Sequence, residues 1–231
     1  MSETTIPSHV GLILDGNRRW AKDRGLPTLE GHRKGADNLR EIAEDFFNKG
    51  VSVVSAYVFS TENWKRSEKE VSYLMKLTTK VLDDFLKEAV EKGTRIVVLG
   101  SREKLSEDVL KAIEKAEKET LQNDTHTLAL CLNYGGRQEI IDAVKFIVDG
   151  NIDSDCIDEP TFHQYLYGDN TIGDVDIVVR TSGELRLSGF MTWRTVYSEL
   201  LFIDKHWPDF NETDVDAVLE EYSSRQRRFG S

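Results

Sequence analysis

The sequence predicts an α/β fold: a single domain with a central, mainly parallel β-sheet flanked by helices. Short apolar, β-rich runs alternate with stretches of helical period along nearly the whole chain, and this alternation is typical of right-handed crossovers that place helices on both faces of a sheet. Polar and charged residues follow directly after four of the runs. Because ligands of such sheets bind at the carboxyl ends of the strands, we expect the functional site at that edge, with an apolar tunnel beside it.

The composition is that of one globular domain over residues 1–231. Of the 231 residues, 39% are hydrophobic and 31% are charged, which is enough apolar material to fill a core. Neither an internal repeat nor a linker divides the chain. The first residues lack the basic and apolar regions of a signal peptide, and no apolar run is long enough to span a membrane. We therefore expect a cytoplasmic protein, with residues 1–8 flexible.

Charge and cysteine content exclude some functions. The formal net charge of −11 argues against a surface that coats nucleic acid, so arginine clusters in this acidic chain are informative. Cys131 lies in an apolar run and Cys156 in a polar one, without metal-ligand spacing. Both are therefore expected to be reduced thiols.

The first apolar run, from His9, ends in a single carboxylate at Asp15. A carboxylate at a strand end can hold a hard cation, and Gly16 lets the backbone approach a ligand closely. The guanidinium groups of Arg18 and Arg19 suit phosphate oxygens. The stretch predicts a magnesium–diphosphate site, although Asp-Gly-Asn is also an ordinary turn sequence.

The rest of the chain continues the alternation of helices and strands. Apolar residues at helical spacing mark the helices, continuous β-rich runs mark the strands, and Gly50, Ser67 and Gly93 provide helix caps. Residues 149–174 are the least regular part, and 200–203 form a further short apolar piece. The expected elements are a helix over 36–49, a strand over 51–59, a helix over 67–92, a strand over 94–99, a helix over 106–121, a strand over 125–132, a helix ending at 148, a short helix over 161–166, a strand over 176–179 and a helix over 212–227.

Polar groups and arginines gather after the predicted strands. Any one arginine could be a solvated surface residue, but that does not explain why several cluster at one edge of the sheet. Together they supply enough positive charge for two diphosphates, so two anionic substrates are the better interpretation. The strand ends begin at Asp15, Ser60, Asn133 and Arg180, and the arginines are Arg18, Arg19, Arg66, Arg180 and Arg186.

Several separated motifs, in order along nearly the whole chain, resemble those of the cis-prenyltransferase family. The resemblance implies an enzyme that adds isopentenyl diphosphate to an allylic diphosphate, such as farnesyl or geranyl diphosphate, with Mg²⁺ and a new Z double bond. The product would be a polyprenyl diphosphate such as undecaprenyl diphosphate. The motifs are His9–Lys22, Gly31-His32, Phe59–Arg66, Asn133–Arg137, Arg180–Arg186, Trp193–Glu199, Trp207–Phe210 and Arg227–Gly230.

The resemblance also implies roles for individual residues. Asp15 would hold Mg²⁺ on the allylic diphosphate, and Glu199 would share the metal when both substrates are present. The family assigns Asn63 to the loss of the proton; since an amide is a poor base, we interpret Asn63 as an orienting group, with Ser60 or a diphosphate oxygen as the acceptor. The allylic diphosphate would contact Gly16, Asn17, Arg18, Arg19, His32 and Arg66. Isopentenyl diphosphate would contact Arg180, Arg186 and Ser188, while Trp20 and Trp64 would wall the site and Thr61, Glu62 and Leu187 complete the substrate-binding set.

The apolar faces of the helices over 36–49 and 68–92 are expected to form a sleeve around the growing chain. Three positions depart from the commoner family pattern, namely Arg18, Thr28 and Gly189. They leave the preferred allylic substrate open. Product length also stays open, with medium or short products favoured over very long ones.

Four alternative functions remain to be weighed. A trans-prenyltransferase needs paired Asp-Asp-x-x-Asp motifs, and the only candidate, at Asp83, lacks the third aspartate. A phosphohydrolase with Asp15 as nucleophile would carry a second aspartate where Asn17 stands. A non-catalytic partner subunit would have lost catalytic residues that this chain keeps, and a short-chain Z-prenyl synthase stays open.

The last expectation concerns assembly. Residues 225–231 carry three arginines in an acidic chain, and such an end is ordinarily solvated. The resemblance implies instead a homodimer in which this tail reaches the neighbouring isopentenyl diphosphate site. It also leaves room for a peripheral membrane contact during product release, and it implies no nucleic-acid partner.

Overall fold

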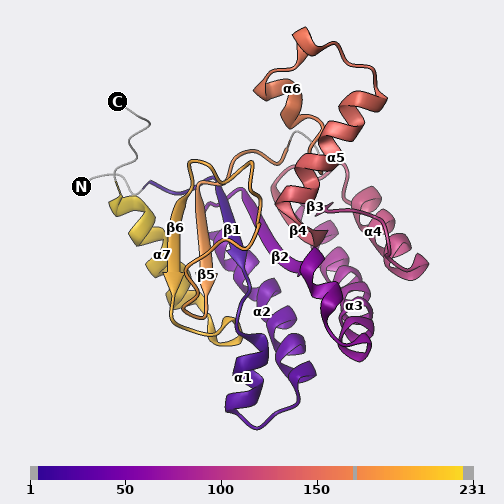
Figure 1. Cartoon of the computed structure of the whole chain (residues 1–231). Helices are drawn as coiled ribbons and strands as arrows, with labels where there is room; N and C mark the ends of the chain where they lie inside the picture. Colours follow the sequence, from indigo (N-terminus) through magenta and orange to yellow (C-terminus); the bar gives the residue numbers. More distant parts are fainter. Residues whose placement is uncertain (1–4, 169–170, 226–231) are drawn as a thin grey trace.

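The computed structural model describes residues 5–168 and 171–225, which form a sheet of six strands covered by helices (Figure 1). The strand order is β3-β4-β2-β1-β5-β6, and every neighbouring pair is parallel. The predicted α/β fold with a parallel sheet is therefore confirmed. The strands are β1 (His9–Ile13), β2 (Val53–Ser60), β3 (Thr94–Leu99), β4 (His126–Tyr134), β5 (Ile177–Thr181) and β6 (Glu199–Ile203).

Helices connect the strands as crossovers. Long amphipathic sequences form α2 to α5 and α7, which pack their apolar faces inward. In the described part of the chain, no helix is long and apolar enough to cross a bilayer. The helices are α1 (Asn17–Asp23), α2 (Thr28–Asn48), α3 (Glu68–Lys92), α4 (Glu107–Glu119), α5 (Gly136–Asp149), α6 (Glu159–His163) and α7 (Glu212–Ser224), with 3₁₀ turns η1 (Thr61–Lys65), η2 (Ser154–Cys156) and η3 (Trp207–Asp209).

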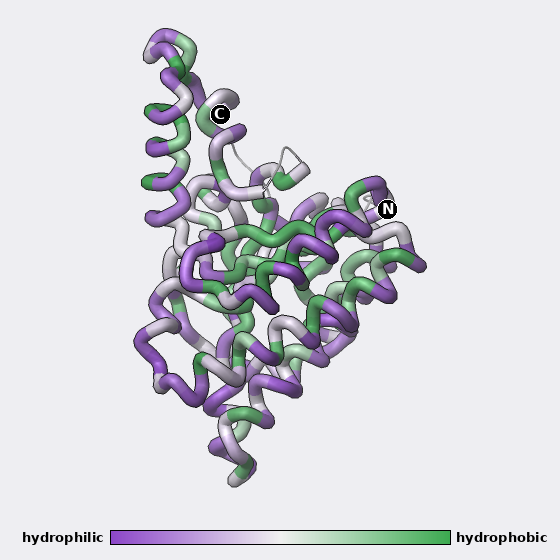
Figure 2. The backbone as a smooth tube through the Cα atoms, turned by 90° about the vertical axis from the view of Figure 1, so that its right-hand side faces the viewer, coloured by the Kyte–Doolittle hydropathy of each residue, from purple (hydrophilic) through white to green (hydrophobic). Residues whose placement is uncertain are grey.

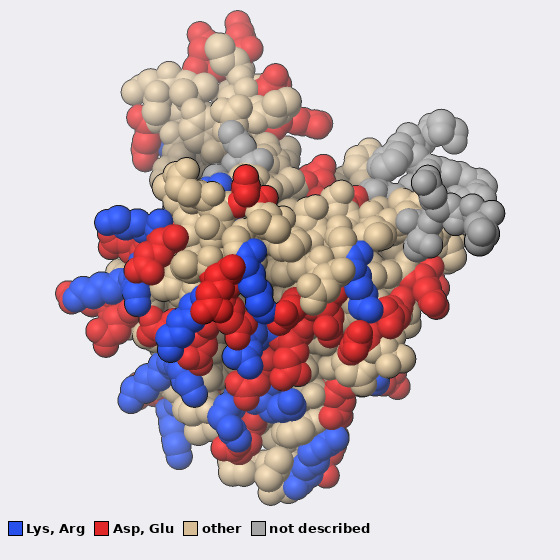
Figure 3. Space-filling view, turned by 180° about the vertical axis from the view of Figure 1, so that it is seen from behind, with Lys and Arg blue, Asp and Glu red and all other residues tan. Residues whose placement is uncertain are grey.

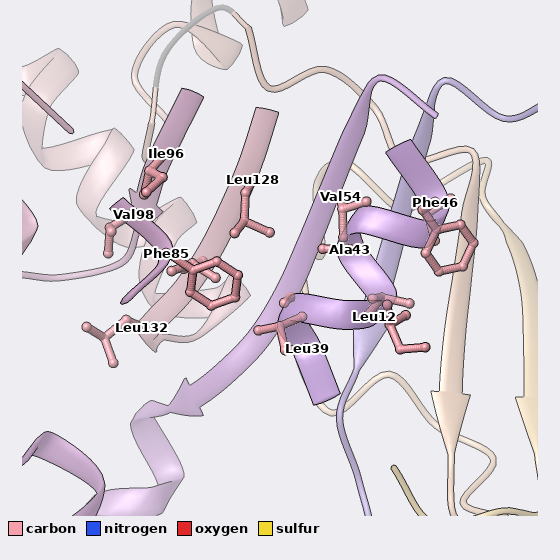
Figure 4. Packing of buried hydrophobic residues seen from close by; sticks show 14 of the residues in the cluster. Leu12, Leu39, Ala43, Phe46, Val54, Phe85, Ile96, Val98, Leu128 and Leu132 are labelled. Atoms are coloured by element: carbon pink, nitrogen blue, oxygen red, sulfur yellow. The ribbon is translucent and has the colours of Figure 1, made fainter. Parts of the chain in front are cut away.

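Two apolar clusters hold the layers together, because successive strand residues point to opposite faces of the sheet. On one face, alternate strand side chains such as Leu12 and Val54 pack against α2, α3, α4 and α7, and Figure 4 shows Leu39, Ala43 and Phe46 of α2 with Phe85 of α3 in this layer. The other face carries a smaller cluster around Cys131. Figure 2 shows the hydrophobic segments gathered in the centre, and Figure 3 shows mixed charges over the lower part of the back surface.

The segment after Asp15 differs from the expectation. Instead of a charged loop it forms α1, and the next helix begins at Thr28 rather than near residue 36. Gly31 and Gly35 lie inside α2 because α1 packs against them: a Cβ at Gly35 would lie 2.3 Å from Asn17 Oδ1, and one at Gly31 only 2.0 Å from the Asn17 carbonyl oxygen. These glycines indicate close helix packing, not a helix start.

The later elements lie close to their expected positions. The apolar piece over 200–203 is the edge strand β6, which begins one residue earlier, at Glu199. The described chain ends at Arg225, so the expected helix over 212–227 is observed only as α7, and the tail beyond lies outside the described residues. A buried ion pair, Arg194 Nη1 to Glu139 Oε1 at 2.8 Å, fastens the irregular segment to α5, because Arg194 also donates to the carbonyl of Tyr167.

Candidate active site

The candidate active site lies where the strand order reverses, at the carboxyl ends of β1 and β5. These two strands are adjacent and parallel, with Ile13 opposite Arg180. The order of strands changes direction at this point, because β2 lies beside β1 on one side and β5 lies beside it on the other. In open α/β sheets this crevice is the usual ligand site.

Asp15 is held from three directions at the end of β1. Its Oδ2 accepts a hydrogen bond from Arg180 Nη2 at 2.8 Å, its Oδ1 accepts one from the Gly16 amide at 2.7 Å, and Arg19 Nη2 lies 3.2 Å from Oδ1. Thr181 Oγ1 fixes the backbone, donating to the Asp15 carbonyl at 2.7 Å. Burial alone would raise the pKa of the Asp15 carboxyl, but Arg180 and Arg19 outweigh it and hold the pKa below its ordinary value. Asp15 is therefore ionised at neutral pH.

The donor set around Asp15 fits Mg²⁺ held jointly with a substrate. Among the described residues, no group of three or more His, Cys, Asp or Glu side chains is arranged to hold a metal alone. Mg²⁺ keeps several waters and is bound through one or two carboxylates plus substrate phosphates. A single ionised carboxylate among arginines suits that mode, and the magnesium site stays a prediction.

A first cleft opens beside Asp15, with a volume of about 770 Å³. It brings together most of the residues expected to contact the allylic diphosphate, from α1, α2 and η1. Lys22 and Thr28 add to it from the α1–α2 hairpin. The expected residues that line it are Asp15, Gly16, Asn17, Arg18, Arg19, His32, Asn63 and Arg66.

A second cleft, of about 1,020 Å³, adjoins the first. Four residues line both clefts, Leu14, Asp15, Asn63 and Arg66, so the two cavities meet at the predicted catalytic residues. The other expected residues that line the second cleft are Ser60, Thr61, Glu62, Arg180, Leu187 and Ser188.

A tight loop after β5 shapes the second cleft. Arg180 Nη1 donates to Ser188 Oγ at 2.8 Å and to the carbonyl of Arg186, which folds the loop back over the strand. Arg180 Nε has no hydrogen-bond partner in the described part of the chain. The Arg186 side chain is exposed and pairs with Glu184 Oε2 at 2.6 Å, while Glu184 Oε1 lies 3.1 Å from Arg19 Nη1. One carboxylate thus links an arginine of each expected substrate pocket.

The side chain of Asn63 is held by the backbone at the end of β2. Its Oδ1 accepts the Ser60 amide at 3.0 Å, which ties η1 to the end of β2. The carboxamide lies at the junction of the two clefts. Its amide oxygen is engaged, so it is not arranged to take up a proton.

The two tryptophans support the site from behind. Trp20 Nε1 donates to Asp209 Oδ1 at 2.7 Å, and the Arg24 guanidinium lies 4.5 Å from the Trp20 ring centre. Trp64 Nε1 donates to Asn133 Oδ1 at 2.7 Å. Neither indole is among the described residues that line the two clefts, so the expectation that they wall the site is not met in this conformation.

An apolar pocket continues from the first cleft between α2 and α3. It shares Leu14, Asn17 and His32 with that cleft, and the sheet floors it through Val98 and Leu130. Its helix side is formed by Leu39, Leu74, Leu77, Val81 and Leu82. The expected sleeve between these helices is therefore present, although it is narrow, with about 80 Å³ of free volume.

Glu199 lies away from Asp15 of the same chain. It is the first residue of β6 and lies opposite Ile177, whereas Arg180 lies three residues further along β5. With a rise of about 3.3 Å per strand residue, Glu199 lies near the amino ends of the strands, whereas Asp15 lies at their carboxyl ends. It is paired there with Arg225 Nη1 at 2.9 Å, so within one chain it does not share a metal with Asp15.

Three residues of the site had not been predicted. Thr181 is the last residue of β5 and Glu184 lies three residues beyond it, and their position at a strand end was the available signal. Glu70 contacts His32 and Arg66; its sequence signal, a glutamate three residues after the helix cap, indicated only capping.

The fold and the site define a class of enzyme for phosphorylated ligands with apolar tails. Arginines line two adjoining clefts around one ionised carboxylate, and an apolar pocket extends from one cleft. Charged head groups and a water-avoiding chain can thus be held together.

Comparisons with known proteins identify the family. A profile described as "Putative undecaprenyl diphosphate synthase" matches residues 13–230. The "Isoprenyl transferase" of Thermotoga maritima is 45% identical over 97% of each chain. A Micrococcus luteus protein named "Ditrans,polycis-undecaprenyl-diphosphate synthase ((2E,6E)-farnesyl-diphosphate specific)" is 43% identical over 97% of this chain and 92% of its own.

A solved structure agrees. Lavandulyl diphosphate synthase from Lavandula x intermedia, determined with dimethylallyl diphosphate, has a TM-score of 0.92 and 34% identity over 98% of this chain and 99% of its own. The chain belongs to the undecaprenyl diphosphate synthase family, the cis-prenyltransferases that its motifs indicated. It is a prenyltransferase.

Proposed function

We propose that the chain condenses isopentenyl diphosphate with an allylic diphosphate, such as farnesyl or geranyl diphosphate, to form a Z-configured polyprenyl diphosphate and release diphosphate. The allylic substrate occupies the first cleft, with its chain in the apolar pocket. Isopentenyl diphosphate occupies the second cleft.

The observation that carries this proposal is the junction of the two clefts at Asp15, Asn63 and Arg66. Two diphosphates bound in adjoining clefts place their reacting carbons near one another, which removes most of the entropic barrier to a bimolecular step. The first cleft shares five lining residues with the apolar pocket and the second cleft shares Leu14 with it, so the pocket is mainly a continuation of the first cleft and suits the tail of the allylic substrate.

The chain's own residues can perform the required steps. Breakage of the allylic carbon–oxygen bond builds charge on the leaving diphosphate, and fixed cations such as Arg19 stabilise this charge more in the transition state than before it. Mg²⁺ bound at Asp15 would add Lewis-acid stabilisation of the same charge. Asn63 orients isopentenyl diphosphate, and a diphosphate oxygen or Ser60 receives the departing proton.

Product length separates the proposal from its nearest alternative. The Micrococcus luteus relative is named for undecaprenyl diphosphate, whereas the lavender structure is of a synthase named for lavandulyl diphosphate. The narrow apolar pocket supports a short-chain Z-prenyl synthase as the second candidate. A non-catalytic partner subunit is the least supported, since Asp15, Asn63 and Arg180 all line the clefts.

A homodimer forms part of the proposal. Exposed apolar side chains cluster on α5 and the segment before β6, with Phe146 54% and Val148 66% exposed, and α5 projects from the body with α6 (Figure 1). Apolar patches of this kind mark interaction sites. The last described residue, Arg225, lies beside Glu199 at the edge opposite Asp15, so we propose that Glu199 and the tail serve the neighbouring subunit.

The test is incorporation of radiolabelled isopentenyl diphosphate into product with geranyl or farnesyl diphosphate as primer, with and without Mg²⁺. Reversed-phase chromatography of the dephosphorylated products beside prenyl alcohol standards gives the chain length. Medium-length Z-polyprenols support the proposal, and products of one or two additions support the short-chain alternative. No incorporation with any allylic primer would overturn both.

A further inference from the structure

Glu70 is a buried carboxylate directly behind the first cleft. Only 8% of the residue is exposed, and it lies in the first turn of α3, where its amide donates to Ser67 Oγ at 3.4 Å. It does not line the first cleft. A carboxylate in such a place is costly unless cations and donors surround it.

One oxygen of Glu70 gathers three basic side chains from three parts of the fold. Oε1 accepts hydrogen bonds from His32 Nε2 at 3.1 Å and from Arg66 Nη1 at 3.0 Å, and Arg18 Nε lies 4.0 Å away. His32 belongs to α2, Arg66 follows η1, and Arg18 belongs to α1. All three line the first cleft.

The carboxylate is ionised in this setting. Burial raises the pKa of the Glu70 carboxyl, but the His32 hydrogen bond and the charges of Arg66 and Arg18 outweigh burial, so the pKa is lowered. The negative charge of Glu70 offsets the repulsion between the guanidinium groups of Arg66 and Arg18. The contact with Arg66 fixes one guanidinium nitrogen and leaves the others available to a ligand, whereas His32, whose Nε2 donates to Glu70, can donate through Nδ1 only when its ring is protonated.

We infer that Glu70 is a positioning residue, which aims His32 and Arg66 at the allylic diphosphate by holding each through the nitrogen that faces away from the ligand. This inference rests on the proposed function and names a further residue of the same site. It gives α3 two tasks, since the helix that walls the apolar pocket also aligns donors for the head group. One helix, α3, would therefore contribute to the binding of both the head group and the tail of the ligand.

Two opposite electrostatic effects make the inference testable. Loss of the negative charge at Glu70 alone would tighten binding of a diphosphate, since the cleft becomes more positive. Loss of orientation would weaken it, because charge-assisted donors lose their alignment. The near-isosteric variant Glu70→Gln separates the two effects, and Glu70→Asp keeps the charge but withdraws it by one methylene group.

The matched control is Glu68→Gln, which removes an exposed carboxylate from the same turn of α3. Calorimetric binding of farnesyl diphosphate without isopentenyl diphosphate avoids turnover. We expect both Glu70 variants to weaken binding about tenfold or more, in line with a charge-assisted hydrogen bond. Glu68→Gln should bind as the unmodified chain does, and thermal unfolding should show each variant folded.

Steady-state kinetics distinguish positioning from general stability. The KM for the allylic substrate should rise more in Glu70→Gln than the KM for isopentenyl diphosphate, because His32 and Arg18 line the first cleft alone whereas Arg66 lines both clefts. Tighter diphosphate binding by Glu70→Gln, or normal binding by Glu70→Asp, would overturn positioning and leave only a counter-charge. Equal rises in both KM values would overturn it as well.

Failure of the proposed function would be seen separately. If the unmodified chain incorporates no isopentenyl diphosphate, the condensation is wrong, but binding of inorganic diphosphate to the unmodified chain and to Glu70→Gln still tests the cleft. Weaker binding by the variant would uphold the positioning role. Equal binding would overturn it.

Discussion

Asp15 shows how much the site depends on charges that are already paired. Its carboxylate binds Arg180, which is nearly buried, as well as Arg19, so substrate and metal would have to share or exchange these contacts. Removal of Asp15 leaves Arg180 without its ionic partner. The substitution therefore tests both chemistry and stability, and the choice of replacement matters.

We expect Asp15→Asn to lower kcat by at least about 100-fold, the scale of losing one electrostatic stabiliser of a transition state. The amide keeps an acceptor for Arg180, so circular dichroism should be unchanged. Asp15→Ala should lose activity and also unfold at lower temperature, because Arg180 is left unpaired. Near-native turnover of either variant at saturating Mg²⁺ would show that Asp15 does not bind the metal.

The pH dependence of stability follows from the same pair. Because the pKa of Asp15 is lowered in the folded chain, its contribution to the free energy of unfolding is full above the unfolded value of about 3.9 and is lost as pH falls through the folded value. The difference in stability between the unmodified chain and Asp15→Asn should be constant from about pH 7 to 5 and shrink below about pH 4. A difference that grows on acidification would contradict this.

Arg186 belongs to the loop over the second cleft. We expect Arg186→Ala to raise the KM for isopentenyl diphosphate about tenfold, the cost of one charge-assisted contact, and the KM for the allylic substrate much less. Initial rates with each substrate varied in turn measure this. Arg102→Ala removes an arginine paired with Glu117 on another element and is the control. Equal effects on both substrates would argue against two separate pockets.

For single residues, the sequence predicted positions in the site correctly where polar residues follow a buried strand. Asp15 and Arg180 were predicted to meet because both lie at strand ends, and they do. Glu70 was missed because His32 and Arg18 are distant from it in sequence and leave no local pattern, while its pairing with Arg66, four residues earlier, is typical of any exposed helix turn. The metal-sharing role of Glu199 stays a prediction, because its position at the start of a parallel strand puts it away from Asp15 of the same chain.

At the scale of elements, α2 and α3 define the length of the apolar pocket. The alternation of helices and strands was predictable, since hydrophobic period decides it. The hairpin of α1 and α2 was not predictable from the sequence. A glycine that permits close helix packing cannot be distinguished in a sequence from a glycine that precedes a helix. The contact of Gly35 with Asn17 shows that this glycine permits close packing, and this contact is seen only in the folded structure.

Product length should respond to side chains on one face of α3. We expect Val81→Phe, which narrows the apolar pocket, to shift products toward shorter chains without changing the KM for isopentenyl diphosphate. Val90→Phe on the same helix is the control, since Val90 is 52% exposed and lies outside the pocket. Chromatography of the product alcohols compares the two. An unchanged distribution in Val81→Phe would mean that the chain does not occupy this pocket.

At the scale of the whole molecule, the proposed dimer accounts for features that one chain leaves unused. Phe146 and Val148 near the end of α5, Glu199 at the start of β6, and Arg225 just after α7 do not line the two clefts of the same chain. Sequence could indicate a basic tail but not which site it serves. That depends on the relative placement of two copies.

The tail prediction tests this arrangement. We expect deletion of residues 226–231, which spares the contact of Arg225 with Glu199, to lower kcat/KM for isopentenyl diphosphate while the dimer mass by light scattering stays the same. Circular dichroism controls for folding. A fully active monomer, or a truncated chain with unaltered kinetics, would show that the tail is an ordinary solvated end.

The pairing of β1 with β5 bears on when activity first arises in the life of a chain. Asp15 and Arg180 lie 165 residues apart in sequence, and parallel strands so distant pair only after a long loop has closed. A nascent chain that has not yet released β5 from the ribosome can form the α2–α3 layer, but its Asp15 lacks the contact with Arg180. Recovery of turnover during refolding would thus require that β5 has already paired with β1.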